Sequence, residues 1–311
     1  MTQTIKIGTR KSPLALWQAY YVRDAILKSA PEIQVELVEI VSEGDKHLET
    51  PLAKIGGKGL FLKELETALL EGSVDIAVHS MKDVTVHLPE GLHIPVICER
   101  EDPRDAFVSN HYASLAELPD GAKVGTCSLR RKSQIAAKYP KLELIDLRGN
   151  VNTRLARLDK GDFDAIILAA AGLMRLEFNQ RIAAFIEPEE MLPAVGQGAV
   201  GIECRQGDAR VEAAIAPLHH ADTASRVWAE RAANEKLGGG CHVPVAAHAT
   251  LDGDDLRLRA LVAAVDGSTV LQCEYTASRD EGWQLGERAA QTLIEQGADN
   301  ILKDVYRELG S

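Results

Sequence analysis

The sequence predicts an α/β fold of two lobes, followed by a small α+β domain at the C-terminal end. Strand-like and helix-like segments alternate through the first third of the chain, and this alternation begins again near residue 123. Such alternation is typical of a mostly parallel sheet with helices on its faces. After about residue 220 the pattern changes to helix, paired strands and helix. We therefore expect domain 1 at 1–98 with 199–217, domain 2 at 104–192 and domain 3 at 221–311.

The first lobe shows three strand patterns and two helix patterns. The first helix has Ser12 as a suitable cap and Pro13 at its first position, and its apolar residues recur at helical spacing. A glycine-rich stretch, "AKIGGKGLF" at 53–61, precedes the second helix and lacks P-loop spacing, so we expect a lid that carries Lys54 and Lys58. The strands are expected at 5–8, 35–42 and 75–80, and the helices at 12–30 and 59–72.

The second lobe repeats this organisation, with strands at 123–126, 142–147 and 164–169 and helices from Ser128 and at 152–161. Two segments are expected to cross between the lobes. "EREDPRD" at 99–105 is charged and broken by proline, and "LPAVGQGAVG" at 192–201 leads into a strand-like segment that returns to the first lobe.

The third domain is expected to open with a helix at 224–237. Strands with turns at 252–255 and 266–268 follow, and an amphipathic helix ends the domain.

Composition and charge narrow the function classes. The chain has 311 residues, and its net charge of −11 argues against a general nucleic-acid binder. Residues 121–160 nevertheless contain ten Lys and Arg against three Asp and Glu, a local balance of +7. This balance indicates a focused anion site, with a solvated helix face as the alternative.

Neither secretion nor membrane insertion is expected. The N-terminus lacks a signal-peptide pattern, and no apolar run approaches about 18 residues. The five scattered cysteines include no CxxC, which favours a reducing cytoplasm, and no histidine pair has metal-ligand spacing.

Residues 237–245, "LGGGCHVPV", place a thiol directly after three glycines. Glycines allow close approach to a backbone, so this stretch suggests that a bulky group lies beside Cys241. His242 is not a catalytic partner, because neighbours on an extended chain point in opposite directions. "GQGAVG" at 196–201 matches a dinucleotide fingerprint, but a strand-like segment follows it where a helix is needed, so we reject that interpretation.

Three strand-to-helix junctions carry arginine, which suggests one polyanionic ligand. They are "GTRKSPLA" with Arg10 and Ser12, "GTCSLRRKSQ" with Ser128, Arg130 and Arg131, and "LRGNVNTRL" with Arg148 and Arg154. Arginines in the first turn of a helix oppose its dipole and need a negative partner. That partner is either an Asp or Glu of the chain or a bound carboxylate or phosphate. Arginine suits planar carboxylates because its donors form a fork.

"VHSMKDV" at 78–84 lies where a strand ends, the place at which open α/β sheets bind ligands. Asp83 beside Lys82 is either an exposed ion pair or a carboxylate poised for proton or cation chemistry.

Several long segments together resemble the porphobilinogen deaminase (hydroxymethylbilane synthase) family. The similarity runs from residue 5 to about 305 and is strongest in the first two lobes. Besides the segments quoted above, it is carried by "GGKGLFLKELE", "DIAVHSMKDV", "EREDPRDAFVS", "DAIILAAAGL", "LPAVGQGAVGIECR" and "GGCHVPV".

The resemblance implies two periplasmic-binding-protein-like lobes joined by the two crossing segments, with the active-site cleft between the lobes, plus the small third domain. It implies that four porphobilinogen molecules condense head to tail with loss of ammonia, and that hydroxymethylbilane is released by hydrolysis for tetrapyrrole and haem biosynthesis. It also implies a dipyrromethane cofactor joined to Cys241 by a thioether. The family is usually monomeric, so we expect a cytoplasmic monomer whose partner is porphobilinogen, with no metal, nucleic acid or membrane.

The same resemblance assigns the site by matching position, with Asp83 as the catalytic residue. The expected cofactor-binding residues are Cys241, Lys82, Asp83, Thr126, Ser128, Arg130, Arg131 and Arg148. The expected substrate-binding residues are Arg10, Ser12, Arg148, Arg154 and Arg175, the last on the resemblance alone.

Two positions depart from the family pattern. Thr85 replaces proline after "KDV", which loosens the expected turn, and Cys127 replaces serine in "GTSSLRR" and adds a thiol near the cleft.

The rival hypothesis is a non-catalytic protein whose lobes close on an anion, with Cys241 merely buried. The missing signal peptide and the glycine-flanked thiol count against it.

Overall fold

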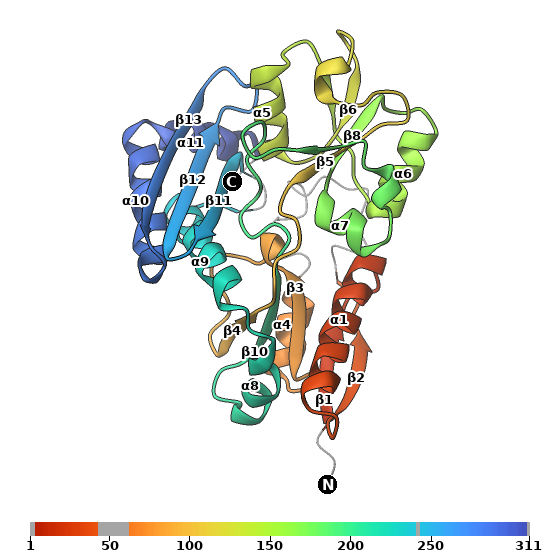
Figure 1. Ribbon diagram of the computed structural model, residues 1–311, viewed down its shortest axis with the longest axis vertical. Helices are drawn as coiled ribbons and strands as arrows, with labels where there is room; N and C mark the ends of the chain where they lie inside the picture. The colour runs from red at the N-terminus through yellow and green to blue at the C-terminus, as the bar shows by residue number, and fades with distance from the viewer. Residues whose placement is uncertain (1–3, 43–61, 241–242, 310–311) are drawn as a thin grey trace. The chain divides into compact units, whose positions relative to one another are not determined.

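The computed structural model describes residues 4–42, 62–240 and 243–309. The chain forms two compact units, Met1–Glu101 with Ala199–Ala224, and Asp102–Gly198 with Ser225–Ser311. Among the described residues, no helix combines the length and the apolar stretch needed to cross a membrane. Figure 1 shows the elements along the chain.

The first unit is built on a five-stranded sheet in the order β2-β1-β3-β10-β4. Its core joins Ile5 and Ile7 of β1 to Val22 and Ile26 of α1 and to Ile215 of α8, and all five side chains are fully buried. The elements are β1 (Thr4–Thr9), α1 (Pro13–Ser29), β2 (Gln34–Glu39), α4 (Lys63–Leu70), β3 (Ile76–Ser80), η1 (Met81–Asp83), β4 (Leu92–Ile97), β10 (Val200–Arg205), α8 (Ala209–Ile215) and η4 (Ala216–Leu218).

The second unit contains another five-stranded sheet, in the order β7-β6-β8-β5-β9. Four of the five residues of β8, "AIILA", are buried, as expected for a strand covered on both faces. The elements are β5 (Asp105–Val108), η2 (Leu115–Glu117), β6 (Lys123–Gly125), α5 (Leu129–Lys138), β7 (Glu143–Ile145), α6 (Val151–Asp159), β8 (Ala165–Ala169), α7 (Ala170–Arg175), η3 (Asn179–Arg181) and β9 (Ala184–Ile186).

The two α/β sheets confirm the predicted fold class, but they are mixed rather than mostly parallel. β1 pairs in parallel with β2 and β3, and β6 pairs in parallel with β7 and β8. β10 runs antiparallel to β3 and β4, and β5 runs antiparallel to β8 and β9. β10 and β5 follow the two crossing segments rather than a helical crossover, and it is parallel pairing of consecutive strands that requires a crossover.

The C-terminal part of the second unit is an antiparallel sheet in the order β11-β12-β13. Its core joins Leu256 and Leu258 of β12 to Ala229 of α9, Leu293 of α10 and Leu302 of α11. The elements are α9 (Ala221–Lys236), β11 (Val245–Asp252), β12 (Asp255–Ala263), β13 (Val270–Ser278), η5 (Arg279–Glu281), α10 (Gly282–Glu295) and α11 (Ala298–Leu309).

The sequence predicted one helix at the end of the third domain, whereas the structure has two, α10 and α11. Gly297 has a φ of 104° between α10 and α11, a conformation that glycine adopts without strain and that ends a helix. The α+β character of this domain is confirmed.

Candidate active site

In the first unit, the predicted site residues lie at the carboxyl edge of two neighbouring parallel strands. β1 pairs with β3 through Ile7 and Ile76, so the two strands end at the same edge of the sheet. Arg10 and Ser12 follow β1, and Lys82 and Asp83 follow β3. Open α/β sheets bind their ligands at this edge.

The junction after β1 is fixed by capping of α1. The Ser12 hydroxyl accepts a hydrogen bond from the Ala15 amide at 3.3 Å, and Pro13 occupies the first helical turn. The Thr9 hydroxyl donates to the Ala15 carbonyl at 3.2 Å. Cap and hydroxyl together hold the turn that carries Arg10, which is half-buried.

Asp83 is exposed on the short 3-10 helix η1, which is anchored by its first residue. Met81 is buried, and its amide donates to the Ala199 carbonyl at 3.0 Å. The Met81 sulfur fills the space beside Gly201, where a Cβ would lie only 2.2 Å from it. Among the residues that the structure describes, none forms a hydrogen bond or ion pair with the Asp83 carboxylate. Met81 therefore holds η1 in place, and the Asp83 carboxylate remains available to a ligand.

Two polar contacts, one buried and one partly buried, hold the last residues of β3. Gln18 of α1 donates to the Ser80 hydroxyl at 2.8 Å. His79 and Glu203 form a buried pair at 2.8 Å between β3 and β10. These contacts fix the end of β3, from which Lys82 and Asp83 project.

In the second unit, the predicted residues also gather at one carboxyl edge, that of β6, β7 and β8. β6 pairs in parallel with both neighbours, so their ends coincide. Thr126 and Ser128 follow β6, Arg148 follows β7, and Arg175 ends α7, the helix directly after β8.

Ser128 caps α5, with its hydroxyl accepting from the Arg131 amide at 3.4 Å. The buried Thr126 hydroxyl accepts from the Ser128 amide at 3.3 Å.

Arg130 and Arg131 share one buried carboxylate, that of Asp105 on β5. The Arg130 guanidinium reaches Asp105 at 2.7 Å and the Leu192 carbonyl at 2.8 Å. The Arg131 guanidinium reaches Asp105 at 2.8 Å and the Ile167 carbonyl at 2.9 Å. Of the two partners left open by the sequence, the structure provides a carboxylate of the chain itself. The trio keeps a net charge of +1, and Arg130 Nε is buried without a hydrogen-bond partner in the described structure.

The charge state of Asp105 follows from these neighbours. Burial by itself raises the pKa of this carboxyl, but the two guanidiniums outweigh burial and hold the pKa well below its usual range. Asp105 is therefore ionised at neutral pH, and both arginines depend on its charge.

At the same edge, Arg148 and Arg154 are more exposed than Arg130 and Arg131, whereas Arg175 is buried. Arg154 donates from Nε to the Gly149 carbonyl at 2.8 Å, and Asn150 caps α6 by accepting from the Thr153 amide at 2.9 Å. Arg148 and Arg154 are half-buried. Arg175 is buried and donates to the Gly198 carbonyl at 2.8 Å.

The segment 192–201 leads into strand β10, as the sequence predicted. Gly196 and Gly198 have φ values of 67° and 87°, and the helix that a dinucleotide fingerprint requires at this point is replaced by that strand. Gln197 donates to the Pro103 carbonyl at 2.6 Å and to Asp105 at 3.0 Å. The Gln197 side chain thus connects the segment 192–201 to the segment 99–105 and to the Asp105 carboxylate that Arg130 and Arg131 share.

Two of the glycines before Cys241 have a structural reason of their own. The Gly238 and Gly239 amides donate to the Glu235 and Asn234 carbonyls, and Gly238 has a φ of 63°, the left-handed cap that ends α9. A Cβ at Gly239 would meet Asn234, whereas a Cβ at Gly240 would meet no atom of the described residues within 4 Å. Only Gly240 is left to be explained by a neighbouring group.

Three predicted residues, Cys241, Lys54 and Lys58, lie outside the described residues, as does His242.

The two positions that depart from the family pattern, Thr85 and Cys127, are both described. At Thr85 the turn is closed by a hydrogen bond from the Val84 amide to the Met81 carbonyl, and the Thr85 hydroxyl donates to the His87 carbonyl at 2.8 Å. Cys127 is a free, half-buried thiol.

Two family models match the sequence along most of its length. "Porphobilinogen deaminase, dipyromethane cofactor binding domain" matches residues 5–213, and "Porphobilinogen deaminase, C-terminal domain" matches residues 224–295. The chain belongs to the porphobilinogen deaminase family. It has the hydroxymethylbilane synthase function, a transferase activity of tetrapyrrole and haem biosynthesis, and the first match identifies dipyrromethane as the cofactor.

Solved structures similar to this chain include three binding proteins. The methionine-binding protein MetQ has 15% identity and a TM-score of 0.47, over 75% of this chain and 94% of its own. The aliphatic sulphonate binding protein SsuA of Escherichia coli has 15% identity and a TM-score of 0.42, over 76% and 70%. A periplasmic substrate-binding protein of an ABC transporter of Coxiella burnetii has 15% identity and a TM-score of 0.41, over 71% and 94%.

Reasoning from the sequence missed Asp105, Gln197 and Glu230. Glu230 is buried and accepts from the Gly196 and Ala249 amides at 2.7 and 2.8 Å. Asp105 stands in the charged stretch 99–105, where nothing in the sequence distinguishes it from its charged neighbours. The available signal was indirect: two arginines at a helix start require a negative partner.

Proposed function

We propose that Asp83 is the catalytic residue with which this chain condenses four porphobilinogen molecules on a dipyrromethane held by Cys241. The observation that carries this assignment is the exposed Asp83 carboxylate, presented on an anchored turn at the carboxyl edge that also bears Arg10. Acidic pyrrole ligands need both features, a carboxylate for the ring N–H and cations for the acidic side chains.

The described residues fit such a cofactor. Each pyrrole carries acetate and propionate groups, and the second unit provides arginines at its carboxyl edge, with Arg130 Nε buried and without an acceptor among the residues that the structure describes. When bound, dipyrromethane supplies the free pyrrole carbon to which the first new ring is joined. Cys241 would hold it covalently, beside Gly240, where no described residue fills the space that a Cβ would occupy.

Asp83 would act on the ring nitrogen of the bound substrate. Its carboxylate accepts a hydrogen bond from the pyrrole N–H and stabilises positive charge that develops on the ring when ammonia leaves. Lys82, next to it, would offer a cation to an acidic side chain. Because η1 is held by Met81, the carboxylate keeps its position as successive rings are added.

The arginines would bind acidic side chains of the cofactor and the growing product. Each charge-assisted hydrogen bond contributes about 1.5–3 kcal/mol, so several can hold a flexible ligand. Arg10, Ser12, Arg154 and Arg175 would bind substrate, Arg148 both substrate and cofactor, and Thr126, Ser128, Arg130 and Arg131 the cofactor. The Asp105 carboxylate would position Arg130 and Arg131 for this. Lys54 and Lys58 would belong to a lid.

We also propose the three-domain division 1–98 with 199–217, 104–192 and 221–311, in which each domain holds one of the three sheets. The protein would work as a cytoplasmic monomer with porphobilinogen as its substrate partner. The reaction would use the organic primer and side chains of the chain, and we assign it no catalytic metal.

Replacing Arg148 or Arg154 by alanine is expected to raise KM for porphobilinogen about 10- to 100-fold, because each replacement removes charge-assisted bonds to substrate. Steady-state kinetics on cofactor-loaded enzyme measure this effect. Arg157→Ala is the matched control, since Arg157 lies on α6 with Arg154 and pairs with exposed Asp162 at 2.9 Å. Equal KM values for all three variants would refute the assigned arginine roles.

A further inference from the structure

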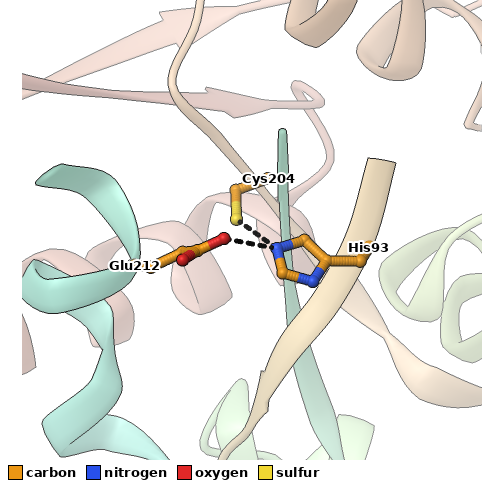
Figure 2. A group of neighbouring side chains, drawn as sticks. All are labelled: His93, Cys204 and Glu212. Atoms are coloured by element: carbon orange, nitrogen blue, oxygen red, sulfur yellow. Dashed lines mark hydrogen bonds and ion pairs between the residues drawn. The ribbon is translucent and has the colours of Figure 1, made fainter. Parts of the chain in front are cut away.

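We propose that His93, Cys204 and Glu212 form a binding site for one zinc ion in the first unit. Their ligand atoms lie within 4.8 Å of one another. Figure 2 shows the Cys204 thiol and the Glu212 carboxylate pointing toward the same nitrogen of His93. His93 Nε2 is 3.4 Å from Cys204 Sγ and 3.0 Å from Glu212 Oε1.

Three separate elements bring these side chains together. Cys204 on β10 is the register partner of His93 on β4, next to an irregularity in the pairing of the two strands. Glu212 lies on α8, which follows β10 after a short turn. The Gly207 amide of that turn donates to Glu212 Oε1 at 3.1 Å and orients the carboxylate. Such support of a ligating carboxylate is typical of metal sites.

The donor set and its spacing favour zinc. Zinc binds thiolate, imidazole and carboxylate with bonds of about 2.3, 2.0 and 2.0–2.2 Å, so neighbouring ligand atoms of a tetrahedral site lie about 3.3–3.6 Å apart. The two separations from His93 Nε2, 3.4 and 3.0 Å, need shifts of only a few tenths of an ångström. The Cys204 thiol and the Glu212 carboxylate, which lie within 4.8 Å of each other, would draw closer around the ion. Magnesium and calcium prefer oxygen ligands alone and fit this set poorly.

The site is open to solvent on one side. The side chains of His93 and Glu212 are each 33% exposed, whereas Cys204 is fully buried. An ion can therefore enter past the imidazole and the carboxylate, reach the thiol, and keep a water in the fourth position.

Hydrogen bonding without an ion leaves this cluster poorly satisfied. One nitrogen of His93 faces both partners, and it cannot donate to Glu212 and accept from the Cys204 thiol at the same time.

Without an ion the Cys204 thiol is protonated at neutral pH. Burial, with Glu212 and Asp208 adding to it, raises the pKa of the Cys204 thiol to about 12. Zinc binding would form the Zn–S bond, and the thiol proton would pass to solvent.

The zinc ion would be separate from the catalysis proposed at Asp83. Along β10, Val200 pairs with Ser80 at the carboxyl end of β3, whereas Cys204 pairs with Ile76 at its amino end. The cluster thus lies toward the opposite edge of the sheet from Asp83. By linking β4, β10 and α8, the ion would stabilise the packing of β10 and α8 in the first unit, which the chain re-enters at Ala199.

Metal titration of the whole purified protein, freed of metal by a chelator, tests this site. We expect one Co²⁺ to bind with a sulfur-to-cobalt charge-transfer band, and one Zn²⁺ to displace it and raise the unfolding temperature. In Cys204→Ala the band should vanish and zinc affinity should fall at least about tenfold. Cys273→Ala, which removes a half-buried thiol on β13, away from the cluster in sequence and sheet, should behave as wild type.

Glu212→Gln serves as a second variant that keeps the shape of the side chain, and its zinc affinity should also fall. The proposal is wrong if the wild type binds no Co²⁺ or binds it without the thiolate band. It is also wrong if Cys204→Ala or Glu212→Gln binds zinc as tightly as the wild type. None of these readouts depends on catalysis, so they stand apart from the proposed roles of Asp83 and the arginines.

Discussion

Asp83→Asn is expected to lower kcat about 10²- to 10⁴-fold while KM for porphobilinogen changes little. The exchange keeps the size of the side chain and its place on η1, where Met81 carries the packing, but it removes the negative charge. That charge is needed mainly where positive charge develops on the substrate ring, so the loss should fall on the rate rather than on binding.

Kinetics on variant enzyme with confirmed cofactor content measure this effect. Glu90→Gln is the control, because Glu90 is another exposed carboxylate on the connection between η1 and β4. Its kcat should match that of the wild type. If Asp83→Asn keeps a kcat within a few-fold of the wild type, another group must carry the catalytic charge.

Asp105→Asn should destabilise the second unit by about 3–5 kcal/mol. Its carboxylate is fully buried and is the shared partner of the Arg130 and Arg131 guanidiniums. Without it, two buried cations would face each other with no counter-charge, the situation in which breaking a buried ion pair costs most. Urea unfolding followed by circular dichroism measures the change.

Asp120→Asn is the matched control, since Asp120 pairs with Lys141 on the surface, where both side chains are more than 70% exposed. Exposed pairs contribute about 0–1 kcal/mol, so this variant should unfold close to the wild type. Equal unfolding midpoints for the two variants would show that Asp105 does not neutralise the arginines.

The stabilisation from Asp105 should also depend on pH. The pKa of the folded carboxyl lies below its ordinary value of about 3.9, so the contribution is complete above that value and is lost as pH falls below it. Lowering the pH below about 4 should therefore narrow the difference between wild type and Asp105→Asn.

The local pattern of the sequence was sufficient to predict much of the fold. Alternating strands and helices predicted β1, α1, β3 and the repeat from β6 onward, and Ser12, Ser128 and Asn150 cap their helices as residue type suggests. Local pattern could not predict the antiparallel β5 and β10, because their pairing is decided by strands distant in the sequence.

The same distinction holds for the sites. Arg10, Asp83, Arg148 and Arg154 stand directly after strands or at helix starts, positions that sequence can recognise. Asp105 and the cluster of His93, Cys204 and Glu212 depend on contacts between distant segments. Their spacing along the chain resembles no metal or ion-pair motif, so only the folded chain shows them.

Intact mass under denaturing conditions tests the central claim most directly. The wild type should be heavier than its sequence by two pyrrole units, and Cys241→Ser should have the mass of its own sequence and no deaminase activity. Cys127→Ser should keep the added mass, because the half-buried Cys127 thiol is not the proposed attachment point. An unmodified wild type, or a fully active Cys241→Ser, would contradict the account.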